Sequence, residues 1–504
     1  MTVITAAAGG GNWSSTGTWT GAVVPTAADD VQLDASSGNV TIDAAAVARS
    51  LDCTGYTGTL THNSGITLSL GDATAGAGNV ALKLVSGMTY TLVNATTSAI
   101  TYVSTSATQQ TITTGGKTLG NWTINGAGSS YLLADANTTG AAATVNVSAG
   151  TLNTGGQTCS WGAFASNTSN TRTVTFGSST ISITGNSTWF DTIPSTGLTL
   201  SAASSTISFT GGANYIRSTL PLGSVAFTAV AQGAQTQGFT CANLTITGSA
   251  AKTTDFILIG NVTVTGTLTL AGNSATNRLK VRATTPGARL TLTAATVAVS
   301  NTDLQDITGA GAGSWDLSAA TGGSGDCGNN SGITFTTAAA QTHTASAGGN
   351  WSDVTKWTSR VPLPQDDVVV DAGTTGTITA DMPRLGRSVD FTGFTGTAAF
   401  SSTANQVFGS LTLASGMTVS GTQALTLAGR GAYRITSAGK SFTQALTLAA
   451  FSGTYTLADA LTTAGALTVS SGVLVTGGNA IGYGSLSVSA GVLVTGGGIF
   501  SAFF

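Results

Sequence analysis

Asp303 and Asp306 are the residues of this 504-residue chain that come nearest to a catalytic pair. Cleavage of a glycosidic bond uses two carboxyl groups, ~5–5.5 Å apart in retaining enzymes and ~6.5–9.5 Å apart in inverting ones. Side chains three positions apart on a strand point to opposite faces of it, so this spacing does not favour a working pair. We assign no catalytic residue and expect that the protein is not an enzyme, although a site shared between the chains of a trimer stays open.

Two trios of aspartates could ligate calcium through carboxylate and backbone carbonyl oxygens: Asp29, Asp30 and Asp34, and Asp366, Asp367 and Asp371. Their spacing matches no EF-hand loop, and three carboxylates are too few for a calcium site on their own. The alternative is that they cap turns and pair with Arg49 or Arg387. We favour this structural role and assign no metal site and no cofactor.

The two histidines, His62 and His343, are not flanked by glycine on both sides. We expect both in turns or on the surface, and not as bases or metal ligands. The chain has no Ser-His-Asp arrangement, no phosphate-binding glycine loop and no zinc-ligand spacing. Residue types therefore indicate no established catalytic chemistry.

The composition indicates which elements hold these residues. Charged residues make up only 7% of the chain, all 20 acidic residues are Asp, and 41% of the residues are hydrophobic. Glu, Lys and Arg favour helix surfaces, whereas Asp, Asn, Ser, Thr and Gly favour turns and strand edges. The hydrophobic fraction is enough to bury a core. These features predict an all-β protein with many turns.

The net charge of −3 comes without a basic run, which argues against binding to nucleic acid. No stretch approaches the ~18 consecutive apolar residues of a membrane span, so we expect no membrane insertion. The opening sequence MTVITAAAGGG has neither a basic segment nor an apolar core, and is not expected to act as a secretory signal.

A long repeat organises the chain. Residues 10–59, GGNWSSTGTWTGAVVPTAADDVQLDA to ARSLDCTGYTGT, recur as residues 348–397, GGNWSDVTKWTSRVPLPQDDVVVDA to GRSVDFTGFTGT. Such a period must be recognised before any local assignment. Trp13 and Trp19 recur as Trp351 and Trp357. We expect these rings to plug one end of a β core, with stacking on a sugar as the alternative.

Short Thr-rich strands follow one another from Gly65 onward, as in GITLSL and NVTVTGTLTL. They fit either a string of β-sandwiches or a solenoid in which each strand stacks on its counterpart one coil further along. The string GVLVTGG occurs at Gly472 and again at Gly491, 19 residues later, which favours the solenoid. We predict an elongated parallel β-solenoid, or β-helix, built from a long tandem repeat. The sandwich string is the alternative.

Two further sets of residues are given structural roles. Cys53 is replaced by Phe391 in the second copy, so we expect a small buried hydrophobe. The four cysteines have no CxxC spacing and do not support a disulfide framework. Three asparagines that precede strands could stack as an amide ladder inside successive turns: Asn121, Asn243 and Asn261.

We divide the chain into a β module at 1–60, a β-solenoid at 61–341, a second β module at 342–400, and a truncated second solenoid at 401–504. An uncapped solenoid end exposes apolar core. The apolar C-terminal residues are therefore a candidate interface with another chain: Phe500, Phe503 and Phe504.

The string GGNWSDVTKW to RVPLPQDDVVVDAG, continuing through DMPRLGRSVDFTGFTGT and VFGSLTLASGMTVSG, resembles repetitive β-solenoid structural proteins of tailed bacteriophages and prophages. Residues 299–336, VSNTDLQDITGAGAGSWDLSAATGGSGDCGNNSGITFT, are similar to the junctions between modules in those proteins. The resemblance covers both copies and hence most of the chain. It implies a structural protein of the virion, of the fibre, spike or appendage type, and it brings no catalytic residues.

The resulting expectation is a non-enzymatic fibre, appendage or surface protein of a phage particle that contacts the host surface. Its expected partners are other virion proteins, further copies of itself (a trimer is one option) and a host-surface glycan. One alternative is a tailspike-like polysaccharide depolymerase. Asn301, Thr302 and Asp303 spell the NTD of polygalacturonase-like hydrolases, but the Asp pair, Gly-His-Gly and Arg-Ile-Lys elements of that family are missing. The other alternative is a bacterial surface adhesin.

Overall fold

The computed structural model describes residues 2–186, 189–211, 215–230, 232–344 and 347–502. The chain is all-β, about 2% helical, and its parallel sheets form a β-solenoid of about 21 turns. This confirms the predicted solenoid against the string of sandwiches. The chain folds into two compact units, Met1–Ile246 with Gly260–Leu268 and Thr247–Ile259 with Thr269–Phe504. No helix in the described ranges is long and apolar enough to cross a membrane.

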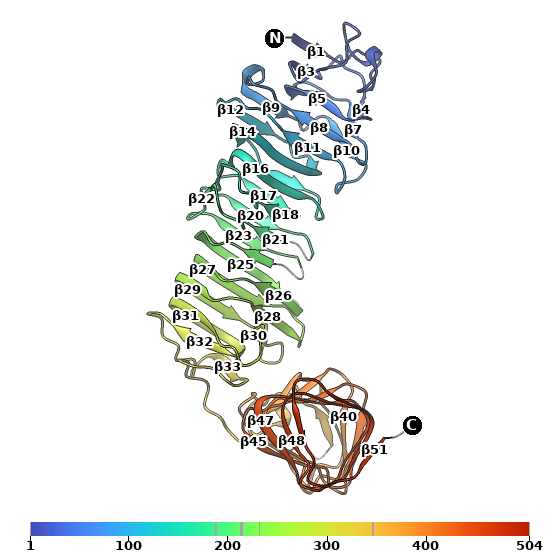
Figure 1. Ribbon diagram of the computed structural model, residues 1–504, viewed down its shortest axis with the longest axis vertical. Coiled ribbons are helices and arrows are strands. Elements are labelled where there is room, and N and C mark those ends of the chain that lie inside the picture. The colour runs from blue at the N-terminus through green and yellow to red at the C-terminus, as the bar shows by residue number, and fades with distance from the viewer. Residues whose placement is uncertain (1, 187–188, 212–214, 231, 345–346, 503–504) are drawn as a thin grey trace. The chain divides into compact units, whose positions relative to one another are not determined.

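The first unit begins with three parallel ladders, so each turn contributes three strands. The first ladder contains β1 (Thr2–Thr5), β3 (Asp29–Gln32), β6 (Ser50–Asp52), β9 (Val80–Lys83) and β12 (Gln109–Thr113). The second contains β2 (Gly11–Asn12), β4 (Val40–Ile42), β7 (Thr59–His62) and β10 (Thr89–Leu92). The third contains β5 (Ala46–Ala48), β8 (Thr67–Leu70), β11 (Ala99–Tyr102) and β14 (Asn121–Leu133). Figure 1 shows β11, β14 and the following β16 (Thr144–Asn153) as neighbours.

The second unit contains the last turns of this solenoid, with β28 (Thr254–Leu258), β30 (Leu279–Ala283), β31 (Leu290–Gln305) and β33 (Thr321–Asp326). A second set of ladders then begins, and its pairing order repeats that of β1 to β14 strand by strand. Its first ladder contains β34 (Gln341–His343), β36 (Val368–Val370), β39 (Val389–Asp390), β42 (Leu411–Thr412) and β45 (Ala432–Thr436). Its second contains β35 (Gly348–Asn350), β37 (Thr377–Thr379), β40 (Thr397–Phe400) and β43 (Thr418–Gly421). Its third contains β38 (Arg384–Gly386), β41 (Asn405–Val407), β44 (Leu425–Leu427) and β47 (Leu446–Leu457). The repeat in the sequence is therefore a repeat of strand pairing.

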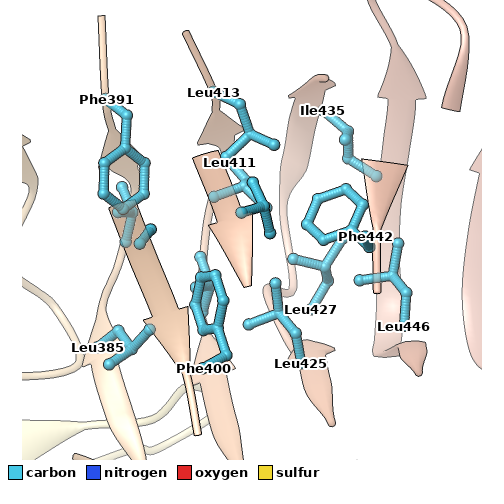
Figure 2. Close-up of a cluster of buried hydrophobic side chains, with 14 of the residues drawn as sticks. Leu385, Phe391, Phe400, Leu411, Leu413, Leu425, Leu427, Ile435, Phe442 and Leu446 are labelled. Carbon is cyan, nitrogen blue, oxygen red and sulfur yellow. The ribbon is translucent and has the colours of Figure 1, made fainter. Parts of the chain in front are cut away.

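Alternation along each strand builds the core, because every second side chain points inward. In the second unit, stacked leucines and phenylalanines fill successive turns (Figure 2). Leu411 pairs in register with Ile435, and Leu425 with Leu446. All four are at most 2% exposed. Burying such a side chain contributes roughly 1.5–3 kcal/mol, so in-register stacking supplies much of the stability.

The last turns confirm the coil length that the sequence indicated. Val473 of β48 (Leu461–Val475) pairs with Val492 of β50 (Val492–Val494), which places the two GVLVTGG strings one turn apart. Phe500 begins β51 (Phe500–Ala502), pairs with Ile481 and is partly buried against the core. Phe503 and Phe504 lie outside the described residues, so the interface proposed for this end stays a prediction.

The tryptophan pairs plug the core, as predicted. Trp13 and Trp19 are each 2% exposed, with ring centroids 4.8 Å apart, and the indole Nε1 of Trp19 donates to the carbonyl oxygen of Trp13 at 2.9 Å. Trp351 and Trp357 repeat this contact, with centroids 4.8 Å apart and the same hydrogen bond at 2.7 Å. Because all four rings are buried, they do not offer a surface for stacking on a sugar.

The four cysteines are free and buried, and Cys53 is 0% exposed, which confirms its predicted role as a small hydrophobe. The predicted amide ladder is wrong in its placement. Asn121 is half-buried, accepts from the amide of Thr144 and donates to the carbonyl of Thr96, so it ties neighbouring turns together from a corner. Asn243 and Asn261 are exposed. Corner positions suit asparagine because its amide satisfies backbone groups that turns leave unpaired.

Candidate functional site

The carboxylate of Asp303 lies at the centre of a charged cluster in the second unit. Asp303 stands in β31 and its side chain is 0% exposed. One carboxylate oxygen accepts from Nε of Arg278 at 2.8 Å, and the other is 2.5 Å from Nε of Arg384. Arg278 belongs to the last turns of the first solenoid, whereas Arg384 begins β38 of the second. One carboxylate therefore connects the two sets of ladders.

Backbone carbonyls complete the shell of Arg278. Its guanidinium donates to the carbonyl oxygens of Gly322 at 2.5 Å, Gly323 at 2.9 Å and Thr302 at 3.1 Å. A buried ion pair is maintained only when further hydrogen bonds satisfy the remaining donors, because removing two charges from water is costly. This arrangement meets that condition.

Asp306 makes a second connection of the same kind. It lies just after β31 with φ of +60°, and both of its carboxylate oxygens accept from the guanidinium of Arg430, at 2.8 and 2.7 Å. Asn329 donates to the same carboxylate at 2.6 Å. The bidentate geometry is the stronger form of an arginine–carboxylate pair.

A third connection joins Lys252, which precedes β28, to Asp381, which precedes β38. The Lys252 ammonium lies 2.5 Å from the Asp381 carboxylate, which also accepts from the amide and hydroxyl of Ser352. In the first copy, Asp43 holds Ser14 in the same way. The repeated aspartate thus keeps its turn-capping role, and in the second copy it also binds the lysine.

The cluster does not suit acid–base catalysis. A glycosidase acid needs a carboxyl whose pKa is raised so that it carries a proton near neutral pH. Burial opposes ionisation of Asp303, but the charges and hydrogen bonds of Arg278 and Arg384 outweigh it and hold the pKa of this carboxyl below its ordinary value. Asp303 binds both Arg278 and Arg384, and Asp306 binds Arg430, so neither carboxylate is presented to a substrate.

The expectation that His62 and His343 are turn or surface residues is wrong, because both are 0% exposed. Each ends a strand at an inward-pointing position, where alternation directs the ring into the core. The two ring nitrogens of His62 contact the hydroxyl of Tyr90 and the carbonyl of Ile66, both at 3.0 Å. His343 packs edge-on against Trp357. Burial lowers the pKa of both imidazoles, so they are neutral core residues.

The first aspartate trio takes the structural role that the sequence favoured. Asp30 is buried and forms an ion pair with Arg49, whose Nε donates to it at 2.9 Å. Asp29 accepts from Thr26, and Asp34 caps a turn by accepting from the amide of Ser36 at 2.8 Å. Each carboxylate is therefore engaged by the chain's own donors.

The second trio repeats the pattern with one change. Arg387 donates to Asp367 at 2.8 Å, as Arg49 does to Asp30, and Asp371 accepts from the amide of Gly373. Asp366 accepts from the amide of Leu363, as Asp29 does from that of Thr26, and in addition binds Arg360 at 2.6 Å. In the part of the chain that the structure describes, no three His, Cys or Asp side chains come together as a metal site.

Sequence reasoning did not find the basic members of the charged cluster. For Arg384 a signal was present: the second copy carries this arginine where the first has Ala46, which is 2% exposed. A charge that replaces a buried alanine between repeats indicates a buried partner. Lys252, Arg278 and Arg430 carry no comparable pattern.

Comparison of the chain with protein-family models, curated proteins and solved structures gives no match. What the cluster can do follows from its own geometry. Three aspartates of the cluster each bind a basic side chain from the other set of ladders: Asp303, Asp306 and Asp381. The side chains of these aspartates are between 0% and 10% exposed. Such pairs hold two structural elements in one register, and they occupy these three carboxylates.

Proposed function

We propose that this chain is a non-enzymatic structural protein of a bacteriophage virion, a fibre, appendage or surface protein that contacts the host. The observation that carries the proposal is the parallel β-solenoid of about 21 turns, in whose second unit buried ion pairs fasten the second set of ladders to the first. The resemblance of the repeat to phage β-solenoid proteins supports the virion assignment. Other virion proteins, and further copies of the chain, would be its structural partners.

The hydrogen bonding between turns of the solenoid supports a structural role. Each turn satisfies its backbone amides and carbonyls on the turns before and after it, so bending the array requires the loss of many hydrogen bonds together. The surface carries few charges, with 7% charged residues in the whole chain. Salt screens exposed charges, so the exposed surface of this chain should respond little to ionic strength.

The test is immunogold electron microscopy with an antibody raised against residues 342–504. Gold on projections of phage particles is the expected result, and its position would show whether capsid, tail or fibre carries the protein. Gold confined to the surface of uninfected cells, with bare virions, would overturn the proposal in favour of an adhesin. In a second experiment, the purified chain is incubated with bacterial capsule and lipopolysaccharide. Release of oligosaccharides would overturn the non-enzymatic assignment.

A further inference from the structure

A groove of about 830 Å³ in the second unit lies beside the charged cluster. Lys280 and Arg282 of β30, Gln305 of β31 and Phe451 of β47 line it. Its volume falls within the ~300–1,000 Å³ that is common for small-ligand sites. None of the predictions from the sequence used these residues.

The side-chain amine of Lys280 has no bonding partner among the described residues. Lys280 pairs in register with Asp255 on one side and Asp303 on the other and is only 8% exposed, yet its amine forms no hydrogen bond or ion pair there. Asp303 is occupied by two arginines, and Asp255 accepts from Arg282 at 2.8 Å through one oxygen, while its other oxygen is buried without a hydrogen bond. Burial lowers the pKa of Lys280, and an anionic oxygen bound in the groove would favour its charged form.

The charge balance around the groove favours an anion. The lining of the groove carries one carboxylate, that of Asp255, and three basic side chains, Lys280, Arg282 and Arg430. The whole chain has only 17 basic residues and a net charge of −3. A local excess of positive charge in a chain of opposite sign raises the local concentration of anions.

The second set of ladders contributes an aromatic ring and hydroxyl groups to the lining. Phe451 is 42% exposed, and the Arg430 guanidinium lies 5.8 Å from its ring centroid. Thr426, Ser470 and Ser471 also line the groove and can exchange hydrogen bonds with ligand hydroxyls. The apolar C–H face of a pyranose packs on an exposed aromatic ring, so this part of the lining suits a hydroxylated ring better than a bare anion.

We propose that this groove binds an acidic saccharide, with its carboxylate or phosphate on Lys280 and a pyranose ring against Phe451. The idea that this saccharide belongs to a host receptor rests on the proposed function. Binding of the saccharide to the purified chain does not, because it can be measured whether or not the protein belongs to a virion. A groove that does not bind the saccharide and a protein that is absent from virions are therefore separate results.

The experiment is calorimetric titration of the full chain with a galacturonic acid trisaccharide, its neutral galactose counterpart and inorganic phosphate. The acidic sugar should bind at least about tenfold more tightly than the neutral one, and raising the salt should weaken it. Lys280→Met should weaken the acidic sugar by about tenfold to a hundredfold and leave the neutral sugar unchanged. Phe451→Ala should weaken both sugars and leave phosphate unchanged.

Two positions in the first unit that do not line the groove supply controls. Lys117→Met removes a half-buried lysine whose amine donates to the carbonyl oxygen of Ser86, and Trp189→Ala removes an aromatic ring that is 48% exposed. Neither should change any titration. The proposal is overturned if the acidic sugar does not bind, or if Lys280→Met, shown by circular dichroism to be folded, binds it like the parent chain. Phosphate that binds as tightly as the acidic sugar, with Phe451→Ala having no effect, would reduce the site to a simple anion site and also overturn it.

Discussion

Replacing Asp303 by asparagine should loosen the second unit far more than its small change in shape suggests. The amide keeps the volume of the carboxylate but leaves Arg278 and Arg384 buried without a counter-charge. Removing one partner of a buried pair costs about 3–5 kcal/mol. At 1.36 kcal/mol per factor of ten, local opening should become about two to four orders of magnitude more frequent.

Labelling of Cys327 by a thiol reagent measures this opening. Cys327 is 1% exposed, and its amide donates to the carbonyl of Leu304 at 2.9 Å, next to Asp303. It should therefore react only when this part of the unit opens. Cys53, 0% exposed in the first unit, is the internal reference and should react as in the parent chain. Peptide mass spectrometry separates the two sites.

Asp367→Asn is the matched control, because it breaks the ion pair with Arg387 in which both side chains are over 40% exposed. Exposed pairs contribute roughly 0–1 kcal/mol, so labelling of Cys327 should rise by less than about fivefold. Equal labelling in Asp303→Asn and Asp367→Asn would refute the argument that burial makes the cluster stabilising. If labelling of Cys327 and of Cys53 accelerates equally, the substitution destabilises the whole chain, which would refute the predicted local opening.

Three further predictions concern the folded chain. Burial lowers the pKa of His62 below its ordinary 6.5, so the folded state binds fewer protons, and the stability contributed by the neutral ring is complete above about pH 6.5 and declines as the pH falls. Thermal unfolding followed by circular dichroism should show this slope. His62→Phe, which introduces the residue found at the matching position Phe400, should remove the part due to His62 and leave the part due to the buried His343. Trp13→Ala should destabilise the first turns by about 3–5 kcal/mol, whereas Trp189→Ala should cost less than about 1 kcal/mol. Limited proteolysis with N-terminal sequencing would measure both effects. Equal effects of the two variants would contradict the placement of Trp13 in the core. Asp459→Ala should leave two turn amides without their acceptor and cost roughly 1–3 kcal/mol, seen as faster hydrogen exchange of those amides and not of distant ones.

Much of the fold could be predicted from the sequence because a solenoid is built from local regularities. Alternation of apolar and polar residues specifies strands with one buried face, and the recurrence of GVLVTGG gives one turn length, which the pairing of Val473 with Val492 confirms. The long repeat also predicted equivalent contacts, such as the pairs of Arg49 with Asp30 and Arg387 with Asp367. These features depend on neighbouring turns only.

The burial of His62 and His343 shows where that reasoning fails. Histidine occurs both in cores and on surfaces, so the residue type does not indicate whether a strand position points inward. In such short strands, the pattern of alternation does not decide which of two successive residues points inward. A shift of one position moves a side chain from the surface to the core. The register of the ladder decides this, and register is set by all the turns together.

The sequence by itself determined the class of fold, the repeat and the roles of residues that bind within one or two turns. Only the tertiary structure decided that Asp303 and Asp306 bind arginines of the second set of ladders, since Arg384 and Arg430 lie 81 and 124 positions away along the chain. The same folding places the Lys280 amine, which has no hydrogen-bond partner among the described residues, on the lining of a groove. Contacts between distant turns depend on how the ladders pack in three dimensions, and no local pattern of residue types encodes that packing.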